Sequence, residues 1–137
     1  MAVQVELKRI IITETSDQQV IFLKEVDGDK KAEGGRAFPI VIGSTEAFAI
    51  DRRLKGLPTP RPQTHELLSD VIEKLGGKLE RIVISDLQDH TFFARLVIRI
   101  NGKSVEVDSR PSDAIALGVA NNVPIFVADH VMDQVAT

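Results

Sequence analysis

The sequence predicts a mostly antiparallel α+β fold in which a strand-strand-strand-helix unit occurs twice, with one further helix between the two units. Two stretches support this prediction, STEAFAI at 44–50 and RPSDAIAL at 110–117. In each stretch one acid, Glu46 or Asp113, directly precedes an alternation of alanine and larger apolar residues. Because both stretches also follow three strand-like segments, the repeated order indicates an internal duplication. The 137 residues are expected to form one domain, 1–137.

The first predicted unit contains three strands and a helix. Alternating apolar residues predict the strands at 3–12, 18–26 and 37–42. The polar stretch DGDKKAEGGR at 27–36 is expected to be a flexible turn. From residue 44 the spacing of apolar residues changes to three and four, which predicts a helix. Its expected apolar stripe contains Ala47, Ile50 and Leu54.

A second helix is predicted between the two units, at 64–75. The three prolines in LPTPRPQT at 57–64 fix the preceding backbone in an extended form, which holds Arg61 in a stiff loop. Thr64 is the expected N-cap of this helix, and Gly76 is the expected left-handed stop. One apolar face is expected to contain Leu67, Leu68, Val71, Ile72 and Leu75.

The second unit repeats the order of the first. Its strands are expected at 79–87, 91–100 and 104–108, with a turn at 88–90. Asn101-Gly102 suits a type I′ turn, so the last of these strands should return antiparallel. A helix then begins at Pro111, and a short strand at 124–128 and a C-terminal helical segment complete the chain.

The composition excludes several classes of protein. The chain has no cysteine, which excludes disulfides and thiolate metal sites and suggests a reducing compartment. It lacks the features of a signal peptide and has no apolar run near the roughly 20 residues needed to cross a bilayer. We therefore expect a soluble, cytoplasmic protein that does not enter a membrane. No P-loop, dinucleotide-binding glycine pattern or nucleophile elbow occurs.

The charge balance restricts any nucleic-acid site to a local surface. Lys and Arg total 17 against 20 Asp and Glu, a net charge of −3, which excludes a protein that simply coats a polyanion. The segment 52–65 is basic and contains no acid. It is either a local phosphate-binding segment or a solvated helix end and loop. Its cationic residues are Arg52, Arg53, Lys55 and Arg61.

Two interpretations of the repeated acids stay open. With Gly43 and Arg110 as the expected N-caps, Glu46 and Asp113 both fall at N3. There a carboxylate can accept from the N-cap N–H and face the positive end of the helix dipole. Alternatively, these acids converge with Asp86 and Asp108, at the ends of two strands, around a divalent cation.

For His65 and Arg110, too, the sequence allows either a functional or a purely structural role. His65 has the intrinsic pKa that suits proton transfer near neutrality, but it is also an ordinary residue for an exposed helix start. Arg110 can either clamp a phosphate or pair with Asp108.

Four motifs together resemble the bifunctional nuclease domain family: IVIGSTEAFAI, PRPQTHELL, HTFFARL and VDSRPSDAIALGV. The resemblance extends from about Val3 to Val135 and implies an α+β domain, self-association and activity on DNA and RNA. This chain departs from the family pattern at Glu66, where Asp is more usual, and at His90, which replaces a turn glycine. The family-like positions are Gly43, Glu46, Ala47, Arg61, Pro62, Thr64, His65, Asp108, Arg110, Pro111, Ser112, Asp113 and Ala114.

The resemblance and the residues together predict an enzyme, a nuclease acting on DNA or RNA with help from Mg²⁺ or Mn²⁺. The alternative is a non-catalytic oligomeric module that binds a ligand or partner, with the acidic motifs serving only as helix starts. Candidate catalytic residues are Glu46, His65, Asp108 and Asp113, of which Glu46, Asp108 and Asp113 are also the candidate metal ligands. Candidate substrate-binding residues are Arg52, Arg53, Arg61 and Arg110.

The strand at 91–100 also predicts self-association. Phe93 and Val97 lie on the face opposite Phe92, Leu96 and Ile98, so both faces of the strand are apolar. A single small domain offers little to cover the second face. We therefore expect a homo-oligomer, most simply a two-fold dimer, joined through a sheet face or edge.

Overall fold

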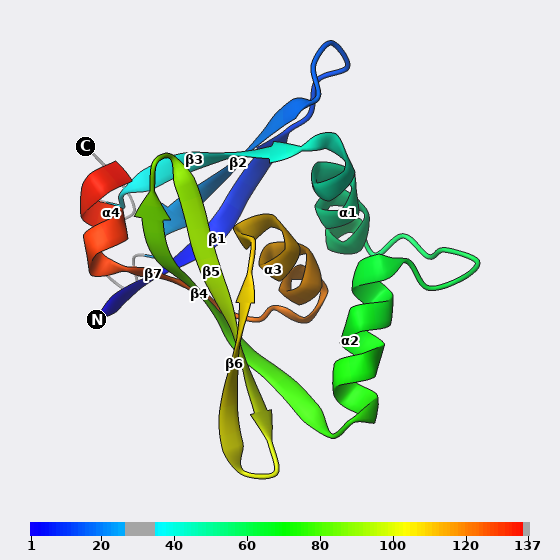
Figure 1. Cartoon of the computed structure of the whole chain (residues 1–137). Helices are drawn as coiled ribbons and strands as arrows, with labels where there is room; N and C mark the ends of the chain where they lie inside the picture. The colour runs from blue at the N-terminus through cyan, green and yellow to red at the C-terminus, as the bar shows by residue number, and fades with distance from the viewer. Residues whose placement is uncertain (27–34, 136–137) are drawn as a thin grey trace.

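The computed structural model describes residues 1–26 and 35–135 and shows a curved sheet with helices packed against it (Figure 1). The strands are β1 (Ala2–Ile11), β2 (Gln18–Glu25), β3 (Ala37–Gly43), β4 (Gly77–Gln88), β5 (Thr91–Ile100), β6 (Lys103–Ser109) and β7 (Ile125–Ala128). The helices are α1 (Ser44–Lys55), α2 (Thr64–Lys74), α3 (Pro111–Gly118), the short 3₁₀ helix η2 (Val119–Asn121) and α4 (Asp129–Val135). None of these helices, the longest of which has 12 residues, could span a membrane.

The sheet has seven strands in the order β3-β2-β1-β7-β4-β5-β6. Every neighbouring pair is antiparallel except β4 and β7, which are parallel. The predicted α+β class with a mostly antiparallel sheet is therefore confirmed. In Figure 1 the sheet curves around α3, with α1 and α2 on the same side and α4 on the other side of the molecule.

The strand-strand-strand-helix order occurs twice, as β1-β2-β3-α1 and β4-β5-β6-α3, with α2 between them. The internal duplication itself stays a prediction. The two repeated helices contact each other, and the alanines of both motifs are buried. Small side chains let the two helices approach closely inside the curved sheet. These alanines are Ala47, Ala49, Ala114 and Ala116.

Two turns determine the register of the second group of strands. Asn101 and Gly102 both have positive φ, 52° and 76°, which confirms the predicted turn between β5 and β6. Asp89 and His90 also have positive φ, 51° and 66°, between β4 and β5. His90 thus adopts a left-handed conformation where glycine is the usual choice. The flexible turn predicted at 27–36 lies largely outside the described residues.

The start of α2 differs from the prediction by one residue. Gln63, not Thr64, is the N-cap, because its side chain accepts from the N3 backbone N–H. In return the Glu66 carboxylate accepts from the Gln63 N–H at 3.0 Å, which completes a capping box. Gly76 has φ of 88°, which confirms the predicted left-handed stop.

The apolar face of α2 is largely exposed to solvent, unlike the apolar face of an ordinary amphipathic helix. Ile72 packs against the core, but no residue of α2 is fully buried. The other four apolar residues remain 40–71% exposed: Leu67, Leu68, Val71 and Leu75. By contrast, Val97 on β5 is only 1% exposed, so the prediction that it lies on an uncovered face of the sheet is wrong. Phe93 is 37% exposed.

Candidate functional site

Three helix starts meet at one cluster of charged side chains. The His65 Nε2 lies 3.0 Å from Asp113 Oδ1, and Arg110 Nε donates to the other carboxylate oxygen, Oδ2, at 2.8 Å. The Arg110 Nη2 then donates to Glu46 Oε2 at 3.2 Å. We call these four residues, Glu46, His65, Arg110 and Asp113, the joint cluster. It contains both repeated acids and joins them through one arginine.

The local backbone explains how Glu46 reaches Arg110. Gly43 and Arg110 are the N-caps of α1 and α3, as predicted, so Glu46 and Asp113 are both at N3. Within the described residues Glu46 and Asp113 bond to Arg110 and His65 and neither accepts from the N–H of its N-cap residue, so the predicted N-cap contact of these carboxylates does not form. Glu46 instead folds over Gly43, where a β-carbon would collide with its carboxylate. Gly43 therefore makes room for the carboxylate that receives Arg110.

The joint cluster favours an ionised Asp113. Burial raises the pKa of the Asp113 carboxyl, but the hydrogen bonds from Arg110 and His65 more than offset burial, so the pKa lies below its ordinary value. The Asp113 hydrogen bond in turn raises the pKa of Arg110 above its usual range. Asp113 is therefore a carboxylate, and Arg110 is a cation, at neutral pH.

His65 is oriented by this carboxylate. It occupies N2 of α2, one position later than predicted, and its side chain is only 12% exposed. With Asp113 ionised, the 3.0 Å contact requires a proton on Nε2. Neutral His65 then has an unprotonated Nδ1 that can accept a proton. The arrangement is that of a general base held in one tautomer by an acid.

Arg53 lies beside the joint cluster but has another role. It is buried, and its guanidinium donates to the main-chain carbonyls of Ala116 and Leu117 in α3. It also pairs with Glu66 of α2 at 3.1 Å. Burial raises the pKa of Glu66, but the Arg53 and Gln63 hydrogen bonds outweigh burial and lower it. Arg53 thus ties α1 to α2 and α3 and is not exposed to a phosphate.

The remaining predicted site residues do not join the cluster. Asp108 is exposed on β6, and Arg110 pairs with Glu46 and Asp113, so the alternative pairing of Arg110 with Asp108 does not form. Asp86 accepts instead from Leu87 and Gln88, and it contacts His130 of α4 at 3.3 Å. Arg61 is exposed in the loop before α2, and the Nε of Arg52 is buried without a hydrogen-bond partner among the described residues.

The predicted metal ligands do not form a metal site in this geometry. Within residues 1–26 and 35–135, no three acidic, histidine or cysteine side chains are arranged to hold an ion. Only two of the three predicted ligands, Glu46 and Asp113, lie together, and the Arg110 guanidinium bonds to both. A divalent cation there would have to displace Arg110.

Comparisons with known proteins agree with the resemblance seen in the motifs. A model of the bifunctional nuclease domain matches residues 21–137. An uncharacterised protein of Mycobacterium tuberculosis is 37% identical over 131 residues, which cover 96% of this chain and 74% of the relative.

Plant relatives match more weakly. Bifunctional nuclease 2 of Arabidopsis thaliana is 28% identical over 110 residues, 78% of this chain and 32% of the relative. Bifunctional nuclease 1 of Oryza sativa subsp. japonica is 24% identical over 119 residues, 85% of this chain and 34% of the relative. The chain therefore spans about a third of each plant protein.

Proposed function

The chain belongs to the bifunctional nuclease domain family, and from this premise we propose that it is a nuclease that hydrolyses phosphodiester bonds at the joint cluster. The observation that carries the proposal is the pairing of His65 with Asp113 beside the Arg110 guanidinium. A base, its orienting carboxylate and a cation for phosphate are thereby close together. Similarity to plant proteins named bifunctional nucleases supports DNA or RNA as the substrate.

The proposed chemistry uses His65 for proton transfer. Nδ1 of His65 takes a proton from water as the water oxygen attacks phosphorus. The imidazolium returns this proton to the leaving oxygen as the P–O bond breaks, so one water is consumed for each diester. Asp113 holds the imidazole in the required tautomer and stabilises its protonated form.

Arg110 is the proposed phosphate-binding residue. It is 62% exposed, and within the described residues its hydrogen bonds to Asp113 and Glu46 use two of its five N–H groups. The remaining donors can stabilise negative charge that develops on the phosphate oxygens. Glu46 and Asp113 fix the direction of this side chain. Asp108 and Arg53 have no part in the proposed reaction.

Cleavage assays on purified protein test the proposal. Labelled single-stranded DNA, single-stranded RNA and duplex DNA are incubated in excess chelator, in Mg²⁺ or in Mn²⁺. We expect cleavage by the wild type and its loss in Asp113→Asn, with the fold verified by circular dichroism. Cleavage that persists in chelator supports the metal-free chemistry above, whereas strict dependence on added metal would contradict that chemistry and return Glu46 and Asp113 to the role of ligands. The absence of cleavage under every condition would favour the non-catalytic binding module.

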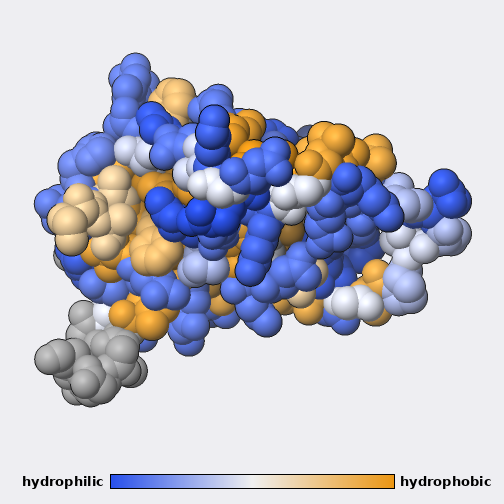
Figure 2. Space-filling model, turned by 90° about the horizontal axis from the view of Figure 1, so that it is seen from below, coloured by the Kyte–Doolittle hydropathy of each residue, from blue (hydrophilic) through white to orange (hydrophobic). Residues whose placement is uncertain are grey.

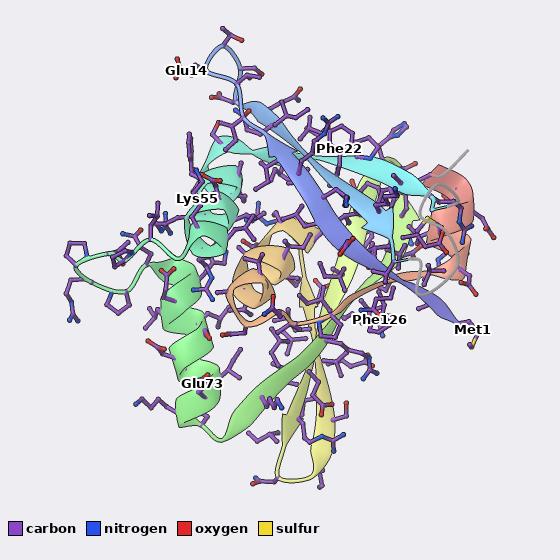
Figure 3. The ribbon with its side chains drawn as sticks, turned by 180° about the vertical axis from the view of Figure 1, so that it is seen from behind. Met1, Glu14, Phe22, Lys55, Glu73 and Phe126 are labelled. Carbon is purple, nitrogen blue, oxygen red and sulfur yellow. The ribbon has the colours of Figure 1, made fainter. Side chains whose placement is uncertain are left out.

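We also propose that the protein self-associates through the exposed apolar stripe of α2, which we call the α2 stripe: Leu67, Leu68, Val71 and Leu75. Figure 2 shows hydrophobic surface at the end of the molecule formed by α2. In Figure 3, labels on Lys55 of α1 and Glu73 of α2 show that both helices lie at one side of the sheet. An isolated 11-residue helix is barely stable in water, so α2 benefits from cover over its apolar stripe.

A second copy of this chain fits the α2 stripe. If two α2 helices pack antiparallel about a two-fold axis near Val71, Leu67 of one copy meets Leu75 of the other. The same arrangement brings Asp70 toward Lys74 of the partner, which pairs opposite charges. The antiparallel helix dipoles also attract each other.

Val71→Glu is therefore expected to prevent self-association. At the two-fold axis the new carboxylate meets its own copy, so like charges are buried together. Sedimentation equilibrium should give twice the chain mass of 15.1 kDa for the wild type and the single mass for the variant. Val105→Glu on edge strand β6 is the control, because Val105 and Val71 are 42% and 43% exposed. Loss of assembly in Val105→Glu alone would place the interface on the sheet edge instead.

A further inference from the structure

A groove of about 950 Å³ borders the joint cluster on the side of the sheet edge. One wall is residues 39–43 of edge strand β3, and the other is Leu87 and residues 89–92 around the β4–β5 turn. The floor includes residues 110–112 at the start of α3. We call it the α3 groove. Arg110 belongs both to this groove and to the joint cluster, so the two sites are continuous.

The start of α3 presents unused hydrogen-bond donors toward this region. Pro111 at N1 has no N–H, and Ala114 N–H already bonds to the Arg110 carbonyl. The N–H groups of Ser112 and Asp113 donate no hydrogen bond within the described residues. They lie at the positive end of the helix dipole, where an anion is favoured.

Ser112 is a second and independent sign of a ligand. The residue is only 5% exposed and lines the α3 groove, yet its hydroxyl forms no hydrogen bond within the described residues. Among the described residues the Nε of Arg52 is the only fully buried side-chain N or O atom without a partner, so the Ser112 hydroxyl is open to the groove and is not sealed in the core. Ser112 was noted in the sequence only as a family-like residue. Its hydroxyl is therefore a donor that a ligand in the groove can use.

The groove also offers features for the rest of a nucleotide. Phe92 borders it and stacks on Phe38 with ring centroids 5.8 Å apart, so an aromatic ring lies where a base can pack. Asp17 and Asp89 border the groove as well, and these acids disfavour several phosphates at once. A single phosphate with its attached nucleosides matches a groove that has a few phosphate donors, one aromatic ring and two acids.

We propose that the α3 groove binds the substrate strand, with one phosphate of single-stranded DNA or RNA held by the Ser112 hydroxyl, the free N–H groups of α3 and Arg110. This inference rests on the proposed nuclease function and specifies where its substrate binds. A phosphate held by Arg110 would lie next to the joint cluster, because Arg110 borders the groove and bonds to Asp113.

Fluorescence anisotropy with a labelled six-nucleotide single strand tests this site at low salt in excess chelator. Ser112→Ala is expected to weaken binding about tenfold, which corresponds to about 1.4 kcal/mol, because the substitution removes one hydrogen bond to the charged phosphate. Ser69→Ala on α2, outside the groove, is the matched control and should bind as the wild type does. Inorganic phosphate should compete with the strand, and the duplex of the same sequence should bind more weakly. Thermal unfolding of each variant verifies that it is folded.

Parallel cleavage assays separate failure of the groove from failure of the nuclease. Equal binding by wild type, Ser112→Ala and Ser69→Ala would overturn the groove, while cleavage by the wild type would still support the nuclease. Binding that depends on Ser112 without any cleavage would support the groove and refute the nuclease. Wild-type protein that neither binds nor cleaves would refute both.

Discussion

Arg53→Met is expected to lower the free energy of unfolding by about 3 kcal/mol. The substitution retains the length of the side chain but removes every donor. It leaves the Ala116 and Leu117 carbonyls and the Glu66 carboxylate without their shared partner, in a buried or partly buried place. Each such loss costs roughly 1–3 kcal/mol, and a broken buried ion pair costs about 3–5 kcal/mol. Urea denaturation at pH 7 measures the change.

Arg52→Met is the matched control, because it removes the neighbouring arginine from the same helix. The Nε of Arg52 has no hydrogen-bond partner within the described residues, so its loss should change stability by no more than about 0.5 kcal/mol. Equal effects of the two variants would contradict the structural role of Arg53.

The ion pair of Arg53 with Glu66 also makes the free energy of unfolding depend on pH. Because the pKa of Glu66 is lowered in the folded chain, its pair with Arg53 stabilises the fold above the unfolded pKa of about 4.3. That contribution disappears as pH falls through the lower folded value. Arg53→Met should therefore have a flatter dependence of unfolding free energy on pH below about 4. An unchanged slope would indicate that the pair does not stabilise the fold.

The secondary structure was predictable because its signals are local. The two-residue alternation in residues 91–100 and the Asn101-Gly102 turn depend only on neighbouring residues, and the structure confirms the strand and the turn that they predict. Gly43 and Arg110 were likewise predictable as N-caps, since each directly precedes a change to helical spacing. Pro111 could also be placed in the first turn of its helix.

The burial of Arg53 was not predictable, because its cause lies 63 residues away in the chain. The helical stripe of α1 predicted Leu54 as a buried residue, but Leu54 is 53% exposed and Arg53 is buried instead. The short helix α3 leaves carbonyl groups without donors near its C-terminus, and a cation is favoured there. A basic run in the sequence does not show which of two neighbouring arginines meets those carbonyls.

The residues of the joint cluster could be predicted from the sequence, but the contacts between them could not. Glu46, His65, Arg110 and Asp113 were all named as candidate site residues, but spacing along the chain gives no distance between two units. Asp108 was named equally, but it lies on β6 and Arg110 bonds to Glu46 and Asp113 instead. The position of Arg110 between the two acids required both helix starts to be placed in space.

His65→Ala is expected to lower kcat for phosphodiester cleavage by about 10²–10⁴, the range typical of a lost general acid or base. The KM should change little, since Arg110 and the α3 groove bind the substrate while His65 only moves its proton. Steady-state kinetics on the single-stranded substrate, across a range of pH, measures both quantities. Loss of the histidine should also remove the ionisation of the base from the pH profile of kcat.

His130→Ala is the appropriate control, because His130 is also an imidazole in contact with an aspartate, Asp86, at 3.3 Å. Asp86 belongs to β4 and His130 to α4, and neither bonds to a residue of the joint cluster, so kcat should stay at the wild-type value. If both histidine variants lose activity equally, the loss reflects destabilisation of the fold. If His65→Ala alone keeps full kcat, proton transfer must come from another group, and Asp113 would act only to hold Arg110 at the start of α3.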